Sequence, residues 1–176
     1  PDGSAPLNNP FYDPFNPRNP RSYIYAYGLR NSFDLIFHPV TGLLYATENG
    51  PETNDELNII YEGKNYGWGT EQISGKQNKP GLEDPLLIYS QTIAPTGITF
   101  YTGSKYPSEY RFNLFFADWN RGHIHRVIFD GREGKKILRV DDNFYVHTDG
   151  IIDLIDGTDG NLYFTDPQGI YRLVFE

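Results

Sequence analysis

Short runs of alternating apolar and polar residues recur along the chain, and turns rich in Gly, Asp and Asn separate them. Alternation with a period of two is typical of β-strands that bury one face. Three units repeat the same order: a strand, a Gly turn, a strand ending in an acid, a second turn and a third strand. The units cover residues 32–61, 96–128 and 150–174. This pattern predicts an all-β protein.

The spacing of the units indicates a β-propeller. Leu44, Leu114 and Leu162 hold matching positions and lie 70 and 48 residues apart. A propeller blade takes about 40–50 residues, which fits once the long loop at 68–84 is allowed for. We expect four-stranded antiparallel blades around a central channel; the alternative is a β-sandwich, which the threefold repetition disfavours. The residues expected to be buried between blades are Leu35, Leu44, Ile98, Phe115, Ile124, Leu162 and Ile170.

The whole chain, residues 1–176, is expected to be part of a single propeller domain. Its first 22 residues contain closely spaced prolines, which sustain neither a helix nor a central strand. The expected division is a loop at 1–22, a blade at 23–68, a loop at 69–94, a blade at 95–140 and a last blade at 141–176.

Three blades do not close a ring, because propellers take about four to eight. An open stack would expose strand edges and an apolar side face, both of which invite association. We therefore expect the remaining blades, or a second chain, to complete the propeller. The chain also begins at Pro1 and contains no Met, so we expect a processed or partial chain.

Composition narrows the classes of function. Aromatic residues make up 16% of the chain, and its 18 Gly and 13 Pro require frequent turns. A net charge of −8 disfavours nucleic acid and anionic membranes as partners, because their phosphates would be repelled. The lack of cysteine excludes disulfides, thiolate metal sites and Cys nucleophiles. No apolar run reaches the roughly 18 residues of a membrane-spanning helix.

The sequence lacks the motifs of several enzyme classes. It contains no G-x-S-x-G nucleophile elbow and no H-E-x-x-H zinc motif. It also lacks a phosphate-cradling Gly loop, so NAD and ATP are disfavoured as cofactors. His123 and His125 would share one face of a strand. We expect that face to be solvated; a two-His metal site is the alternative.

Four clusters of Gly, Asn, Arg and carboxylates lie between residues 27 and 68. An alternating run at 23–27 predicts a strand whose tip presents Arg30 and Asn31. An Arg fork beside an amide suits a carboxylate or quinone oxygen. The tight turn at Gly50 and Pro51 offers backbone carbonyls, which hard Ca²⁺ accepts as ligands. The alternatives are a surface Arg held by a turn and a Gly-Pro turn without a ligand.

The order and spacing of these clusters resemble the C-terminal half of the soluble glucose/sorbosone (aldose sugar) dehydrogenases. Members of that family are six-bladed β-propellers that use pyrroloquinoline quinone (PQQ) and Ca²⁺. The resemblance implies that the residues contacting the cofactor are Arg30, Asn31, Asn49, Asp55 and Thr92. It also implies two Ca²⁺ sites, one at PQQ through the carbonyls of Gly50 and Pro51 and a structural one at Glu56 and Tyr66. The alternative for the second is a packed turn in which Asn58 and Asn65 bond backbone groups and Trp68 fills the core.

The resemblance implies oxidation of the anomeric carbon of an aldose to a lactone, with PQQ as the hydride acceptor. It also implies a periplasmic or secreted protein. The family's proton-abstracting His lies in an earlier blade, so none of the four histidines here is expected to have that role.

Four positions depart from the family pattern. Phe33 stands where Gln is expected, Asn120 where Lys is expected, and Gly150 and Ile152 where two Arg are expected. Each charge-assisted hydrogen bond to a PQQ carboxylate contributes about 1.5–3 kcal/mol, so these losses weaken the expected binding. Arg121 is a candidate substitute for the Lys. The alternative function is a non-catalytic, Ca²⁺-stabilised propeller that serves as an extracellular binding or assembly module.

Overall fold

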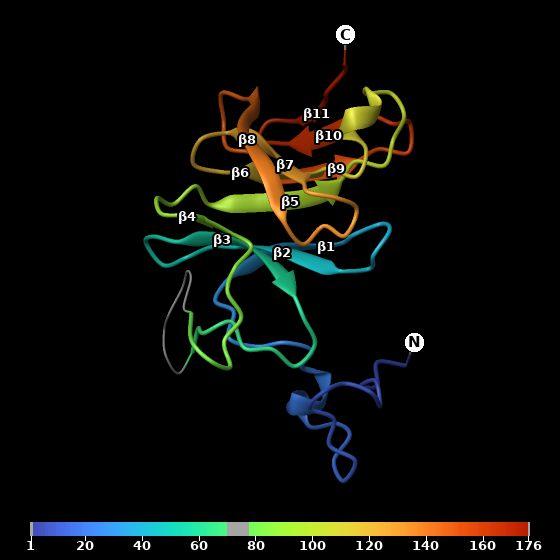
Figure 1. The fold of residues 1–176 in the computed structure, drawn as a ribbon, viewed down its shortest axis with the longest axis vertical. Helices are drawn as coiled ribbons and strands as arrows, with labels where there is room; N and C mark the ends of the chain where they lie inside the picture. The colour runs from blue at the N-terminus through green and yellow to red at the C-terminus, as the bar shows by residue number, and fades with distance from the viewer. Residues whose placement is uncertain (1, 70–77, 176) are drawn as a thin grey trace.

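A computed structural model of the chain describes residues 2–69 and 78–175. Within them, three antiparallel β-sheets are stacked one above another (Figure 1). The first sheet contains β1 (Ser32–Phe37), β2 (Leu44–Glu48), β3 (Asp55–Ile60) and β4 (Leu87–Tyr89). The second contains β5 (Pro95–Phe100), β6 (Leu114–Asp118), β7 (His123–Phe129) and β8 (Ile137–Val146). The third contains β9 (Asp153–Asp156), β10 (Leu162–Thr165) and β11 (Ile170–Arg172).

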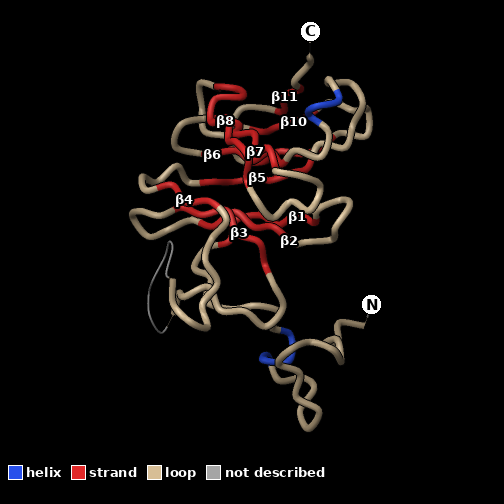
Figure 2. Tube along the Cα trace, viewed as in Figure 1, coloured by secondary structure: helices blue, strands red, loops and turns tan. Residues whose placement is uncertain are grey.

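Helical structure in this part of the chain is confined to two short 3₁₀ turns, η1 (Pro20–Tyr23) and η2 (Ser108–Tyr110). The all-β class predicted from the alternating pattern is therefore confirmed. The N-terminal segment forms loops that lie beyond the first sheet, away from the other two (Figure 2). No helix among the described residues is long and apolar enough to cross a membrane.

Two strand assignments differ from the boundaries expected from sequence. β4 pairs with β3 inside the segment 69–94, which was expected to be a loop. β8 continues to Val146 and pairs with β7, so the second sheet extends past the expected boundary at residue 141. Both are the last strands of their sheets. These segments are strands because they pair with a neighbouring strand. The alternation of apolar and polar residues within each segment does not reveal that pairing.

The predicted strand at residues 23–27 is wrong. Asn19 caps η1 through its side chain, and the turn ends at Tyr23. The chain then runs beside residues 63–68. The backbone N–H of Tyr27 donates to the Lys64 carbonyl, and the backbone N–H of Tyr66 donates to the Tyr27 carbonyl. Tyr23, Tyr25 and Tyr27 are all exposed. The alternation there consequently marks no buried face.

The core lies between the sheets, as expected for stacked blades. Ile98, Phe115, Ile124 and Leu162 are buried, which confirms the prediction for them, whereas Leu44 is only half-buried. Polar contacts also join the three sheets: Thr47 Oγ1 donates to the Thr96 carbonyl and Thr96 Oγ1 to the Ile151 carbonyl, both at 2.8 Å.

The predictions that Leu35 and Ile170 are buried are wrong. Leu35 is 54% exposed because β1 turns its other face, with Asp34 and Ile36, toward the second sheet. Ile170 is 78% exposed on β11, at the edge of the third sheet. An alternating strand has two faces, and its pattern alone does not say which one a neighbour covers.

The first and third sheets each have a face that the described residues leave uncovered. Phe33 and Phe37 flank Leu35 on β1, and all three are at least half exposed. On the third sheet, Ile155 and Ile170 are exposed. Contiguous apolar exposure of this kind marks a surface that another part of the protein or a partner covers.

Candidate functional site

The ends of several strands meet at one end of the sheet stack. The end of β2 and the start of β3 lie there, as do the start of β5 and the end of β6, because neighbouring strands are antiparallel. Three hydrogen bonds tie the connecting loops together. The Asn49 backbone N–H donates to the Asn31 carbonyl, Asn49 Nδ2 to the Pro95 carbonyl and Asn120 Nδ2 to the Thr92 carbonyl, each at 3.1 Å. We call this end the rim; its candidate site residues are Arg30, Asn31, Asn49, Gly50, Pro51, Thr92 and Asn120.

Glu48 fixes the backbone that carries Arg30 and Asn31. It is the last residue of β2 and only 4% exposed. Its Oε1 accepts hydrogen bonds from the N–H groups of Arg30 and Asn31, and its Oε2 accepts one from the Ser32 hydroxyl. Sequence reasoning gave Glu48 no such role. The sequence signal that could have indicated this role is an acidic residue at the end of an apolar strand, next to a polar turn.

The Arg30 side chain lies along the surface of the rim. Its Nη1 donates to the Asn49 carbonyl at 3.1 Å, and its guanidinium lies 5.6 Å from the centre of the Trp68 ring. A cation over an aromatic face is attracted by the ring quadrupole. The guanidinium is thus held in place while the residue stays exposed, so further N–H groups can reach an acidic ligand.

Asp55 is buried behind the rim, with 1% of its surface exposed. Its Oδ1 accepts from the Gly50 N–H at 2.8 Å, and its Oδ2 accepts from the N–H groups of Ile93 and Ala94 at 2.6 and 2.8 Å. Asp55 therefore joins the loop after β2 to the loop before β5. Its carboxylate acts on the rim through the backbone that it holds.

The turn at Gly50 and Pro51 keeps two backbone carbonyls available. Among the described residues, none donates a hydrogen bond to either carbonyl oxygen. The turn lies at the surface, with Pro51 exposed. Unpaired carbonyl oxygens are ligands that a hard cation such as Ca²⁺ prefers.

Two buried glutamates face each other beneath Arg30. Glu48 and Glu56 are paired across β2 and β3, and both are no more than 5% exposed. Together with Tyr66 and Trp68 they line a small cavity. It offers about 10 Å³ to the centre of a water-sized sphere, which is room for roughly one water or ion.

The residues around this cavity fit a hard cation. Asn58 follows Glu56 on the same face of β3 and donates to its Oε2 at 3.0 Å. The Asn58 Oδ1 atom, in a side chain with no exposed surface, accepts no hydrogen bond from the described residues. Glu48 and Glu56 both line the cavity, and carboxylate oxygens are ligands that a hard cation prefers.

Tyr66 has only its backbone carbonyl left to offer a metal. Its hydroxyl donates to the Ile59 carbonyl at 2.7 Å and accepts from the Tyr61 N–H at 2.8 Å. Burial raises the pKa of Tyr66 to about 12, so the phenol stays protonated. The packed-turn alternative holds only in part. Asn65 Oδ1 accepts a hydrogen bond from the Gly67 N–H, as that alternative expects, but Trp68 is only half-buried.

Two of the four departing positions have a local structural explanation, and Phe33 and Ile152 have none. Asn120 is engaged with the Thr92 carbonyl across the rim. Gly150 packs against Trp119 so closely that a Cβ would lie 2.4 Å from the Trp119 carbonyl oxygen, and a side chain there requires the backbone to shift. Phe33 and Ile152 are both partly open to solvent. Arg121 is exposed on the same turn as Asn120.

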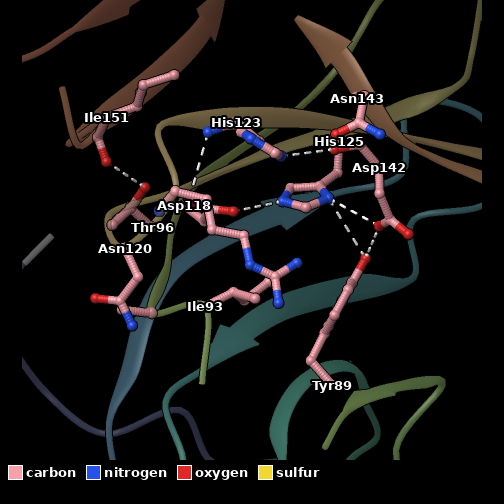
Figure 3. A network of polar contacts seen from close by, with 12 residues as sticks. Tyr89, Ile93, Thr96, Asp118, Asn120, His123, His125, Asp142, Asn143 and Ile151 are labelled. Atoms are coloured by element: carbon pink, nitrogen blue, oxygen red, sulfur yellow. Dashed lines mark hydrogen bonds and ion pairs between the residues drawn. The ribbon is translucent and has the colours of Figure 1, made fainter. Parts of the chain in front are cut away.

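A buried histidine network supports this turn, and the expectation of a solvated face for His125 is wrong (Figure 3). His125 has no exposed surface and stacks on Phe116. Its Nε2 lies 2.8 Å from Asp118 Oδ2 and its Nδ1 lies 2.9 Å from Asp142 Oδ1. Each ring nitrogen therefore lies against a carboxylate oxygen from a different strand. Sequence alternation missed this because both acids come from other strands.

The network extends to both sides. The Tyr89 hydroxyl, from the first sheet, donates to Asp142 Oδ1 at 2.5 Å. Burial, helped by Asp142, raises the pKa of Tyr89. The other oxygen of Asp118 accepts from the Arg121 N–H at 2.8 Å, which holds the turn that carries Asn120. The network therefore joins two sheets and orients one loop of the rim.

Comparison with known proteins identifies the family. The family model described as Glucose / Sorbosone dehydrogenase matches residues 1–173. The chain belongs to the glucose/sorbosone dehydrogenase family. Within this family, the chain is 33% identical over 190 residues to an uncharacterised protein of Synechocystis sp., covering 98% of the chain and 42% of that relative.

Two solved structures of aldose sugar dehydrogenases resemble the chain. The soluble Escherichia coli enzyme, in its apo form, is 27% identical with a TM-score of 0.76, covering 91% of this chain and 47% of that one. The PQQ-bound enzyme of Streptomyces coelicolor is 27% identical with a TM-score of 0.71, covering 93% and 43%. The chain thus spans less than half the length of these relatives. The fold class expected from sequence is confirmed: a six-bladed propeller with about three blades in this chain.

Proposed function

We propose that the protein containing this chain oxidises the anomeric carbon of an aldose to a lactone with PQQ as hydride acceptor. The observation that carries the proposal is the gathering of Arg30, Asn31, Asn49 and the Gly50–Pro51 turn on one rim, with their backbone fixed by buried carboxylates. The similarity to a PQQ-bound aldose sugar dehydrogenase supports the same cofactor.

The residues present fit both groups that the family implies. Arg30, Asn31, Asn49 and Thr92 would hold PQQ, and the carbonyls of Gly50 and Pro51 would hold Ca²⁺ beside it. When bound, PQQ would accept a hydride from the sugar and Ca²⁺ would act as a Lewis acid. Glu56 and the Tyr66 carbonyl would hold a second, structural Ca²⁺.

The contribution of this chain is to orient rather than to move protons. Arg30 offers N–H donors to an acidic or carbonyl oxygen, and Trp68 and Asn49 restrict the orientation of its guanidinium. Glu48 keeps the Arg30–Asn31 backbone in one conformation, and Asp55 sets the position of the Gly50 turn. Preorganised donors of this kind need no rearrangement when the substrate reacts.

A second function is favoured by the rim's departures from the family. Asn120 makes a neutral hydrogen bond to Thr92, and Gly150 leaves no room for a longer side chain beside Trp119. Fewer cations at the rim weaken binding of a tricarboxylate. The second proposal is therefore a Ca²⁺-stabilised propeller without PQQ that serves as an extracellular binding or assembly module.

The partners follow from the same reasoning. The uncovered faces at Leu35 and Ile170 would pack against the remaining blades or a second chain. The substrate would be an aldose sugar. We also propose a periplasmic or secreted location, as the family resemblance implies.

The experiment is an activity assay on the complete protein that contains this chain. PQQ, Ca²⁺, an aldose and an artificial electron acceptor are supplied, and reduction of the acceptor is followed. Dye reduction that is lost in Arg30→Ala and kept in Arg139→Ala, an exposed arginine on β8, supports the dehydrogenase. A folded protein that shows no aldose-dependent reduction favours the second function.

A further inference from the structure

A larger cavity lies at the opposite end of the stack, where β1 and β7 end. It is lined by the turn after β1 at His38 and Val40, by the loop between β5 and β6, and by the loop after β7. About 390 Å³ is open to the centre of a water-sized sphere. Pockets for small molecules range from roughly 300 to 1,000 Å³, so the space suits a small ligand. Both flanking sheets belong to this chain.

The loop that carries Arg132 is anchored across the sheets. Tyr45, on β2 of the first sheet, donates from its hydroxyl to the Gly134 carbonyl at 2.6 Å. Gly134 has a φ of +72°, and a Cβ there would lie 2.4 Å from the Tyr45 hydroxyl. Glycine is therefore required for this contact. The contact fixes one wall of the cavity.

The loop between β5 and β6 forms the second wall and is held by Arg126. This arginine is 6% exposed and donates from Nε to Asn113 Oδ1 at 2.7 Å and from Nη2 to the Glu109 carbonyl at 2.8 Å. The Phe112 N–H donates to the Tyr101 carbonyl at 2.8 Å. The wall is consequently built before any ligand arrives.

Every polar side chain that lines the cavity can donate a hydrogen bond. Arg111 and Arg132 line it, and neither forms a salt bridge within residues 2–69 and 78–175. Asn113 uses its oxygen for Arg126, which leaves its NH₂ group to donate. His38 accepts from the Val40 and Thr41 N–H groups through Nδ1, so its Nε2 carries the proton. Burial lowers the pKa of His38, which favours this neutral form.

Among the described residues, no Asp or Glu lines the cavity. The loop after β7 contains two acids outside the lining, Asp130 and Glu133, and Asp130 is paired with Lys136 at 2.8 Å. Phe112 and Phe129 add apolar surface to the lining. Two guanidiniums, further N–H donors and two aromatic rings match an anion with an apolar body.

We propose that this cavity binds a small organic anion whose carboxylate or phosphate group accepts hydrogen bonds from Arg111 and Arg132 and whose apolar part contacts Phe112 and Phe129. The site lies at the end of the sheets opposite the rim. It is therefore separate from the proposed sugar oxidation and does not depend on it.

Calorimetric titration of the complete protein tests the proposal with four probes: benzoate, phenyl phosphate, inorganic phosphate and neutral benzamide. We expect saturable binding of benzoate or phenyl phosphate, with benzamide and inorganic phosphate weaker. Arg111→Gln and Arg132→Gln should each weaken the better probe about tenfold, which corresponds to about 1.4 kcal/mol. Arg111→Lys keeps the charge and should recover part of the loss.

Arg139→Gln is the matched control, because it removes an exposed arginine that does not line the cavity. Circular dichroism confirms that each variant is folded. The proposal is overturned if no anion binds saturably at millimolar concentration, or if benzamide binds as tightly as benzoate. It is equally overturned if inorganic phosphate matches phenyl phosphate, or if Arg139→Gln weakens binding as much as the lining variants.

Discussion

The Glu48 carboxylate accepts a hydrogen bond of 2.6 Å from the backbone N–H of Arg30, which lies 18 residues earlier in the chain. Glu48 ends a strand of the first sheet, whereas Arg30 lies in a loop outside it. The sheet thereby fixes the loop that presents the guanidinium. Glu48 is a positioning residue, because it acts on the rim through Arg30 and Asn31.

Replacement of Glu48 by Gln should loosen this loop. The amide offers one accepting oxygen in place of two and turns an NH₂ group toward donors. We expect the free energy of unfolding to fall by about 1–3 kcal/mol, the usual cost of a broken buried hydrogen bond. Urea unfolding measures the loss. Glu52→Gln, at an exposed turn position, is the control and should not change stability. Equal stability of both variants would contradict the positioning role.

Replacement of Asp55 by Asn should release the two loops that it joins. Its carboxylate holds the N–H groups of Gly50, Ile93 and Ala94. Amide hydrogen exchange at these three positions should become faster because a partner is lost. The Tyr101 N–H, bonded to the Asn113 carbonyl just beyond the paired ends of β5 and β6, serves as the internal control. Unchanged exchange at all three amides would refute this role.

Removal of Ca²⁺ should lower the melting temperature of the complete protein. A ligand that binds only the native state stabilises it by mass action, by about 2.7 kcal/mol at a hundredfold excess over its Kd. Glu56→Gln should shrink the shift, because it removes a carboxylate from the cavity beside Tyr66. Glu62→Gln, exposed just after β3, should keep it. A melting curve that chelator leaves unmoved would rule out a structural ion.

Asp166 should make stability depend on pH in the acid range. Burial acts to raise its pKa, but hydrogen bonds from His147 and from the N–H groups of Gln168 and Gly169 lower it to about 2. A folded-state pKa below the ordinary value of 3.8 means that the stabilisation is present above pH 4 and is lost as the pH falls toward 2.

The measurement is the free energy of unfolding between pH 5 and about 2. Asp166→Asn should flatten the profile over that range, and His147→Gln should reduce its slope. Glu52→Gln, an exposed acid between β2 and β3, is the control. An Asp166→Asn profile as steep as that of the unchanged protein would speak against the assignment.

The fold could be predicted because its signals are local. Alternation and the repeated order of turns identify the strands around Leu44, Leu114 and Leu162, and each of these lies in a strand of a different sheet. The sequence could not predict which face of β1 is covered. Asp34 and Leu35 lie on opposite faces of the strand, and the alternation does not say which face meets another sheet. That choice depends on the neighbouring sheet.

The candidate site was predictable in part, because some of its residues belong to local sequence clusters. Arg30, Asn49 and Gly50 come from clusters that the sequence displays, and they do gather at one rim. Glu48 and His125 were missed, because their roles depend on partners supplied by other segments. A buried charged residue is recognised only when its partners are known.

The central claim is that this rim binds PQQ through Arg30 with the help of Ca²⁺, and direct titration of PQQ tests it. The complete protein is titrated by calorimetry with Ca²⁺ present and again with chelator. The account predicts saturable binding that requires Ca²⁺ and that Arg30→Ala weakens by at least about tenfold, the effect of one charge-assisted hydrogen bond. Absence of saturable binding, or affinity that Arg30→Ala leaves unchanged, would contradict it.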